Sequence, residues 1–245
     1  MPQKKRIFLA TSLFVVSAFS FQACSQGIQL GNIGKLVQSL PISSTEASSA
    51  LKQALEIGVN KSTQLASATG GYSANPLIRI PVPPDLQNVE KTLRSIGLGN
   101  QVDQFVLAMN QGAEKAAKEA APIFLKSITE MTVTDAISIV KGEKNAATTY
   151  LNRTTRADLS KLFQPIMAKS LQETTASKLY GDIVTRYNQV PFVKKLNPNL
   201  EQYATEKALD GLFVLIAQEE AKIRENPLER TTELLKKVFA NTTKP

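Results

Sequence analysis

One stretch constrains the fold of this chain more than any other, the segment from Gln101 to Leu125. Its apolar residues recur every three or four positions, which places them in one stripe along an α-helix. The first half of the stripe carries large side chains and the second half almost only small ones, which let a second helix approach closely. The stripe therefore predicts a helix inside a bundle, and its members are Val102, Phe105, Val106, Met109, Ala113, Ala116, Ala117, Ala120 and Phe124.

The rest of the chain predicts further helices and no alternation of strand and helix, so the class is all-α, a multi-helix bundle of about eight helices with one short extended segment. Pro122 is expected to kink or divide the central helix. Capping residues, or an asparagine followed by proline, predict where other helices begin. The expected helix starts are Ser44, Thr132 with Asp135, Thr155 with Asp158, Asn197 and Asn226.

The expected extended segment lies between Tyr72 and Pro84. Three apolar residues there alternate with an arginine and two prolines, and proline cannot donate the backbone hydrogen bond that a central strand needs. The pattern predicts an extended loop or an edge strand, in which Ile78, Ile80 and Val82 alternate with Arg79, Pro81 and Pro83.

Composition excludes several function classes. The chain has no histidine, no tryptophan and one cysteine. Histidine-based acid-base catalysis, Ser-His-Asp and Cys-His systems, and metal sites with imidazole ligands are therefore impossible within this chain. The net charge of +8 is compatible with anionic lipid head groups or with an ordinary mixed, solvated helical surface, and no nucleic-acid-binding signature appears. Neither a metal, a cofactor nor a nucleic-acid partner is predicted.

The N-terminus predicts export. Residues 1–23 combine a basic start at Lys4, Lys5 and Arg6 with an apolar run, which is typical of a signal peptide. Cys24 then follows a small residue and resembles the cysteine of a bacterial lipobox, which would make it the lipid-modified, palmitoylated first residue of the mature protein. The alternative is ordinary cleavage after Ser20, which leaves a free thiol in an oxidising compartment.

The same pattern predicts domain organisation and location. Residues 24–43 are polar and glycine-dotted and are expected to form a lipidated tether, with the helical domain over residues 44–240. Ser25 stands where an aspartate would favour the inner membrane, so the sequence resembles lipoproteins forwarded to the outer membrane. We therefore expect an envelope protein that faces the periplasm and is attached to the membrane through Cys24.

One charged residue falls on an inward face. Glu220 lies near the middle of the apolar stripe of the C-terminal helix, where an isolated charge costs several kcal/mol or more. Arg224 lies four residues on, a good geometry for an ion pair. Two interpretations stay open: a structural pair joined by Asn110 or Tyr150, or a polar anchor that lines an apolar ligand pocket. Glu114 is expected to project about 100° away from the centre of the central stripe, and Glu219 to face about 100° away from Glu220.

Several blocks of residues, in order along the chain, resemble the bacterial family catalogued as domain of unknown function number 4197. The likeness runs from about Glu46 to Ala240 and implies an exported, helical, often lipoprotein-like domain with no assigned activity. The blocks include Met109–Glu114, Met131-Thr132 with Asp135-Ala136, Ala146–Thr148 with Tyr150, Ala208–Phe213, and Glu219-Glu220 with Ile223-Arg224.

Three functional hypotheses follow. The first is a non-enzymatic envelope lipoprotein that binds an apolar or amphipathic small molecule or a protein partner. The second is a carboxylate-dependent hydrolase with Glu220 as acid or base, and the third is a purely structural envelope protein. The missing histidines and the lack of a paired catalytic carboxylate favour the first hypothesis over the second.

Overall fold

A computed structural model describes residues 43–172 and 200–225, with a few isolated positions between these two ranges. All of them belong to the second of the two units into which the chain divides, Pro41–Pro245. The predicted signal peptide, Cys24, nearly all of the predicted tether and the predicted helix from Asn226 lie outside the described residues.

The described residues form seven α-helices and one 3₁₀ turn, Pro84–Leu86, and contain no strand, which confirms the all-α class. This is one helix fewer than the predicted number of about eight. The helices are α2 (Ser44–Ser67), α3 (Gln87–Ser95), α4 (Gly99–Ala117), α5 (Ala121–Glu130), α6 (Val133–Lys141), α7 (Ala146–Gln172) and α9 (Leu200–Glu225).

The predicted central stripe is buried along its whole length, on α4 and the start of α5. Pro122 divides the predicted helix, because α4 ends at Ala117 and α5 begins at Ala121 with the proline in its first turn. A Cβ atom added at Gly112 would lie 3.0 Å from the Met167 sulfur and 3.0 Å from the Ser170 Cβ. Gly112, next to the small half of the stripe, therefore lets α7 pack closely on α4, which is the close approach of a second helix that the sequence predicted.

Two of the predicted helix starts are correct or nearly so, and one is wrong. Thr132 and Asp135 form the predicted capping box of α6. The capping residue of α2 is Ser43, one residue before the predicted one. The predicted start at Thr155 is wrong, because α7 is continuous from Ala146 and the Thr155 hydroxyl donates to the Leu151 carbonyl at 2.6 Å. A threonine inside a helix makes this bond readily, so a capping pattern alone does not require a helix end.

The segment expected to be extended is a loop rather than a strand. The predicted alternation holds up to Val82, since Ile78, Ile80 and Val82 are buried while Arg79 and Pro81 are exposed, but it ends there because Pro83 is buried too. The loop lies against α9, where a Cβ added at Gly211 would be 3.0 Å from both Tyr72 and Ile78.

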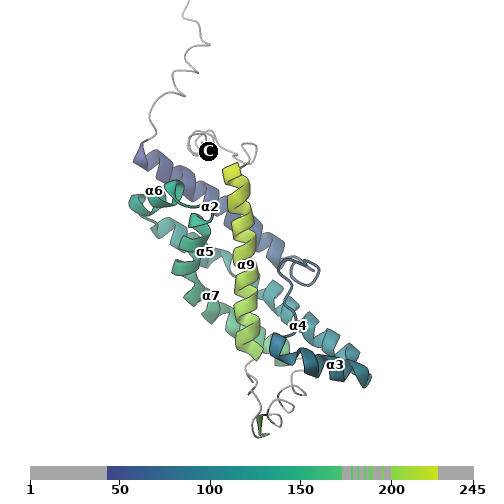
Figure 1. Ribbon diagram of the computed structural model, residues 1–245. Helices are drawn as coiled ribbons and strands as arrows, with labels where there is room; N and C mark the ends of the chain where they lie inside the picture. The colour runs from purple at the N-terminus through teal and green to yellow at the C-terminus, as the bar shows by residue number, and fades with distance from the viewer. Residues whose placement is uncertain are drawn as a thin grey trace, which may run out of the picture. The chain divides into compact units, whose positions relative to one another are not determined.

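Helix α9 packs mainly against α2, α4 and α7, and Figure 1 shows it running along the bundle. Its buried residues range from Leu200 to Ile223 and include two consecutive acids, Glu219 and Glu220. Among the helices that the structure describes, none combines the length and the hydrophobicity of a membrane span.

Candidate functional site

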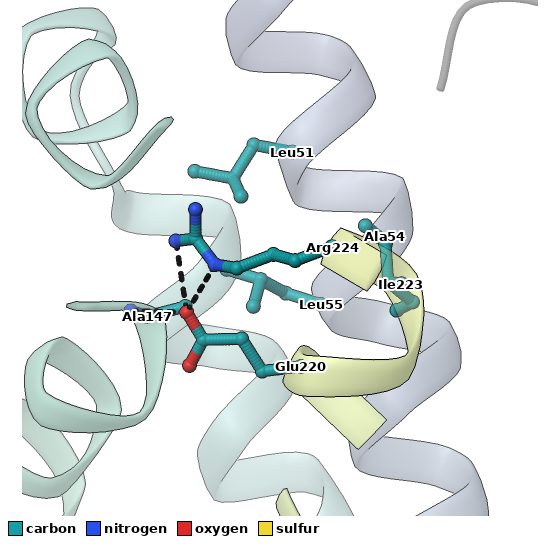
Figure 2. A pocket seen from close by; sticks show the side chains of 7 residues that line it. All are labelled: Leu51, Ala54, Leu55, Ala147, Glu220, Ile223 and Arg224. Atoms are coloured by element: carbon teal, nitrogen blue, oxygen red, sulfur yellow. Dashed lines mark hydrogen bonds and ion pairs between the residues drawn. The ribbon is translucent and has the colours of Figure 1, made fainter. Parts of the chain in front are cut away.

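The candidate site is the ion pair of Glu220 and Arg224 near the C-terminal end of α9 (Figure 2). The Arg224 Nε and Nη2 atoms each lie 2.9 Å from the Glu220 Oε1 atom. The Glu220 and Arg224 side chains are only 5% and 13% exposed, respectively. A charged pair this far from water is stable only if its remaining polar atoms also find partners.

The other partners of Glu220 come from the first turn of α7. The backbone N–H groups of Ala147 and Thr148 donate to its two carboxylate oxygens at 3.1 and 2.8 Å, and the Thr148 hydroxyl donates at 2.8 Å. The first N–H groups of a helix have no partner within the helix, and the helix dipole favours a negative charge beside them. Glu220 is therefore the N-terminal cap of α7, supplied by a different helix.

Arg224 binds the C-terminal end of a third helix, α6. Its Nη2 atom donates at 3.0 Å to the carbonyl of Ile139, in the last turn of α6. A cation is favourable at that end, because the last carbonyls of a helix lack partners and carry partial negative charge. One ion pair thus binds the end of α6 and the start of α7 to α9.

Gly142 makes the short connection between α6 and α7 possible. A Cβ atom at this position would lie 2.8 Å from the Ser138 carbonyl oxygen and 2.9 Å from the Ala146 Cβ. The backbone itself is extended here and needs no glycine for its angles. The requirement is space, because the connection folds tightly enough to bring both helix ends to one ion pair.

A small pocket adjoins the pair. It is lined by Glu220, Arg224 and five apolar residues, and it encloses about 20 Å³, room for about one water molecule. Pockets for small organic ligands usually hold about 300–1,000 Å³. The apolar residues are Leu51, Ala54, Leu55, Ala147 and Ile223 (Figure 2).

The arrangement leaves Glu220 little capacity for acid-base chemistry. Each of its oxygens accepts at least two donors, and a proton on the carboxyl group would have to replace one of these bonds. A general acid or base needs a free approach for the proton it transfers. The geometry is therefore that of a joint between helices.

Asn110 and Tyr150, the other two predicted members of this network, lie in different surroundings. Asn110 is fully buried, accepts from the Ile80 N–H and donates to the Ile80 and Val106 carbonyls. Tyr150 is partly buried beneath Arg153, whose guanidinium lies 5.6 Å from the ring centre. Burial, and next Asp135, raise the pKa of the Tyr150 hydroxyl. The structure brings together Glu220 and Arg224 but places these two residues in separate contacts.

Glu114 is a residue whose role the sequence analysis missed. It was expected to face away from the central stripe, yet it is only 8% exposed. Its Oε1 atom accepts hydrogen bonds from the Tyr72 N–H, the Ser73 N–H and the Ser73 hydroxyl, each at 3.1 Å. The loop covers this side of α4, which lies about 100° away from the centre of the predicted stripe. The sequence feature that could have predicted this role is the spacing of four residues between Glu114 and Asn110, which places both polar groups on one side of α4.

Glu219 was expected to face about 100° away from Glu220, and it is buried on that other side of α9. Its side chain is 6% exposed and forms ion pairs with Lys61 of α2 at 2.9 Å and with Lys222 at 2.6 Å. Burial raises the pKa of the Glu219 carboxyl, but the two lysines outweigh it and hold the pKa below its ordinary value. Helix α9 is packed on two sides here, against α2 through Glu219 and against α7 through Glu220.

Within the described ranges, no group of three or more His, Cys, Asp or Glu side chains is placed to hold a metal ion. Fold and site together define a helical domain whose buried charges join helices. The chain belongs to the family described as Protein of unknown function (DUF4197), which matches residues 41–240. No curated protein and no solved structure matches the chain.

Replacing Glu220 with glutamine tests the joint. We expect Glu220→Gln to lower the free energy of unfolding by about 3–5 kcal/mol, because it leaves the Arg224 charge buried without its counter-charge. Chemical denaturation measures this loss, and hydrogen exchange should show faster exchange of the Ala147 and Thr148 amides. Glu225→Gln is the control, since the Lys144–Glu225 pair is exposed and should contribute less than about 0.5 kcal/mol. Equal stability of Glu220→Gln and wild type would contradict the assignment.

Two substitutions at Glu114 test its contact with the loop. We expect Glu114→Ala to cost about 2–4 kcal/mol, because it leaves the buried Tyr72 N–H and the partly buried Ser73 N–H without an acceptor. Glu114→Gln should cost about 1 kcal/mol or less, since its amide oxygen can still accept from both groups. Urea denaturation measures the loss of unfolding free energy in each of the two variants. Indistinguishable losses would show that the hydrogen bonds to the loop are not what the residue contributes.

Proposed function

We propose that this protein is a non-enzymatic lipoprotein of the cell envelope, held at the membrane through Cys24, whose helical domain binds a protein partner. The observation that carries the non-enzymatic part is the complete engagement of Glu220. The strongest candidate for acid-base catalysis accepts three hydrogen bonds from α7 and pairs with Arg224. A hydrolase that depended on this carboxylate would have to break the joint in each catalytic cycle.

The size of the pocket supports a protein partner over an enclosed small molecule. About 20 Å³ beside the ion pair accommodates a water molecule but not the apolar or amphipathic ligand that the sequence also suggested. Large apolar side chains are exposed elsewhere on the described part of the domain, with Leu77 and Ile96 each 65% exposed. Exposed apolar groups are the usual anchors of protein contacts, although single ones are common on any surface.

The membrane attachment rests on the N-terminal sequence. The basic start, the apolar run and the lone cysteine after Ala23 support lipidation at Cys24, and Ser25 supports delivery to the outer membrane. A tether of about 20 residues has a root-mean-square reach of about 25 Å, enough to let a domain contact partners near the membrane surface. We include in this proposal the full bundle of about eight helices, the last beginning after Asn226.

Substitution of the cysteine tests the anchor. We expect Cys24→Ser to move the protein from the membrane fraction to the soluble fraction of the cell, because the side chain that would carry the lipid is gone. Fractionation followed by immunoblotting measures the shift, and Gln26→Ala, two residues away, is the matched control. Membrane association that survives Cys24→Ser would reject lipid anchoring at this residue.

Native mass spectrometry of protein extracted from membranes tests the binding proposal. We expect the mass of an acylated chain without a stoichiometric small molecule, together with a complex that contains a second protein. The Cys24→Ser protein supplies the reference mass without acylation. A bound small molecule at one per chain would instead favour the ligand-binding hypothesis.

A further inference from the structure

The loop between α2 and α3 changes character after Ile78. From Thr69 to Ile78 it consists almost entirely of turns, and residues 79–83 then run on without a turn or a helix. Pro83, at the end of this extended segment, has φ −51° and ψ 138°, near the polyproline II conformation, which makes no hydrogen bonds of its own. The main chain of such a segment therefore needs partners from outside it.

Helices α4 and α9 supply those partners. The Asn110 side chain on α4 accepts from the Ile80 N–H at 2.9 Å and donates to the Ile80 carbonyl at 2.9 Å. The Tyr203 hydroxyl on α9 donates to the Pro81 carbonyl at 3.2 Å. All three bonds go to main-chain atoms of the segment, so they recognise an extended chain and not a particular side chain.

The loop follows the line along which α4 and α9 meet, since the two helices also contact each other directly. Earlier in the loop, Tyr72 donates from its N–H to Glu114 of α4 at 3.1 Å and from its hydroxyl to the Ala208 carbonyl of α9 at 2.6 Å. Both acceptors lie about one turn later in their helices than the residues that hold the extended segment. The loop therefore runs antiparallel to both helices, and we call the surface that it covers the α4–α9 face.

The side chains of the extended segment alternate against this face. Ile78, Ile80 and Val82 are at most 9% exposed, while the two residues between them are exposed. Ile78 packs on α9 at Gly211, where an added Cβ would lie 3.0 Å from the Ile78 Cβ. Hydrogen bonds to the main chain, combined with burial of alternate side chains, are a recurrent way in which proteins bind extended peptides.

Asn110 distinguishes this loop from one that only fills space. Its side chain is 0% exposed, and within the described residues its partners are Val106 of its own helix and the main chain of Ile80. A buried amide group costs free energy unless it is hydrogen-bonded, so α4 carries a polar group that requires an extended chain beside it. Another chain with free main-chain groups and apolar residues at alternate positions would meet the same requirement.

We propose that the α4–α9 face is a binding site for an extended, proline-containing segment of a protein partner, and that residues 78–83 occupy it as an internal ligand. Prolines hold such a segment extended before it binds, which lowers the entropy cost of binding. The internal segment is tethered at both ends, so its effective concentration is high and it excludes weak partners. This inference rests on the part of the proposed function that gives the domain a protein partner, and it does not depend on the lipid anchor.

A labelled peptide tests the site. The probe is a synthetic peptide of residues 76–84 with a fluorophore, and the protein is the full chain carrying Ile78→Ser and Ile80→Ser, which weaken the internal segment without changing either helix. We expect fluorescence anisotropy to show about tenfold tighter binding to this chain than to wild type, because the internal segment competes less. Adding Asn110→Ala should weaken binding about tenfold, since both bonds to the main chain are lost. Gln111→Ala, at the exposed neighbouring position, is the matched control and should leave binding unchanged.

Two results would overturn the site once circular dichroism has verified that each variant is helical. One is the absence of peptide binding to the folded chain with Ile78→Ser and Ile80→Ser, and the other is binding that Asn110→Ala does not weaken. Either result rejects the α4–α9 face alone. The protein partner of the proposed function would then bind elsewhere, and native mass spectrometry would still detect it.

Trypsin digestion of the wild-type chain carries the test if the substituted chain does not fold. Arg79 is exposed but lies between buried neighbours, so cleavage after it requires the segment to leave the face. An unlabelled peptide of residues 76–84 with Arg79→Gln, which trypsin does not cut, should speed this cleavage in proportion to its concentration. The same peptide with Ile78→Ser and Ile80→Ser should not. A cleavage rate that ignores the first peptide would overturn the proposal, and one that falls as the protein concentration rises would overturn it in favour of a segment from a second copy of the chain.

Discussion

The described part of this domain depends on one buried ion pair. Glu220 and Arg224 sit one turn apart on α9, and between them they satisfy the first amides of α7 and a terminal carbonyl of α6. Removing two charges from water costs several kcal/mol for each ion, and good geometry with added hydrogen bonds offsets that cost. The added partners come from two other helices, donors from α7 and a carbonyl acceptor from α6, so the charges are tolerable only when all three helices are in place. The pair therefore makes the docking of α6 and α7 on α9 mutually dependent.

The same use of polar side chains recurs elsewhere in the described residues. Glu219 fixes α9 to α2 through Lys61, while Asn110 and Glu114 of α4 bind the backbone of the loop that follows α2. In each case a buried polar group on a helix satisfies a neighbour that helical packing alone would leave unpaired. Buried acids in a protein without histidine invite a catalytic interpretation, but here their partners are backbone groups and basic side chains of the same domain.

The chain belongs to a family of unknown function, so its membership identifies the domain but assigns no activity to it. A fold can host many functions, and function has to be argued from a site. The site that the sequence singled out is a structural joint beside a pocket about the size of one water molecule.

Periodicity and capping patterns in the sequence determined the helical class, the buried stripe of the central helix, its division near Pro122 and the alternation at Ile78, Ile80 and Val82. They also placed Glu220 and Arg224 together, because residues four apart on a helix are neighbours. Only the tertiary structure decided which partners these residues meet and which acids are buried. Glu114 and Glu219 lie off the main apolar stripes, and they are buried because the loop covers α4 and because α9 is packed on two sides. Asn110 and Tyr150 contact other residues than the predicted Glu220–Arg224 pair. Contacts between distant segments depend on helix packing, which local spacing does not specify.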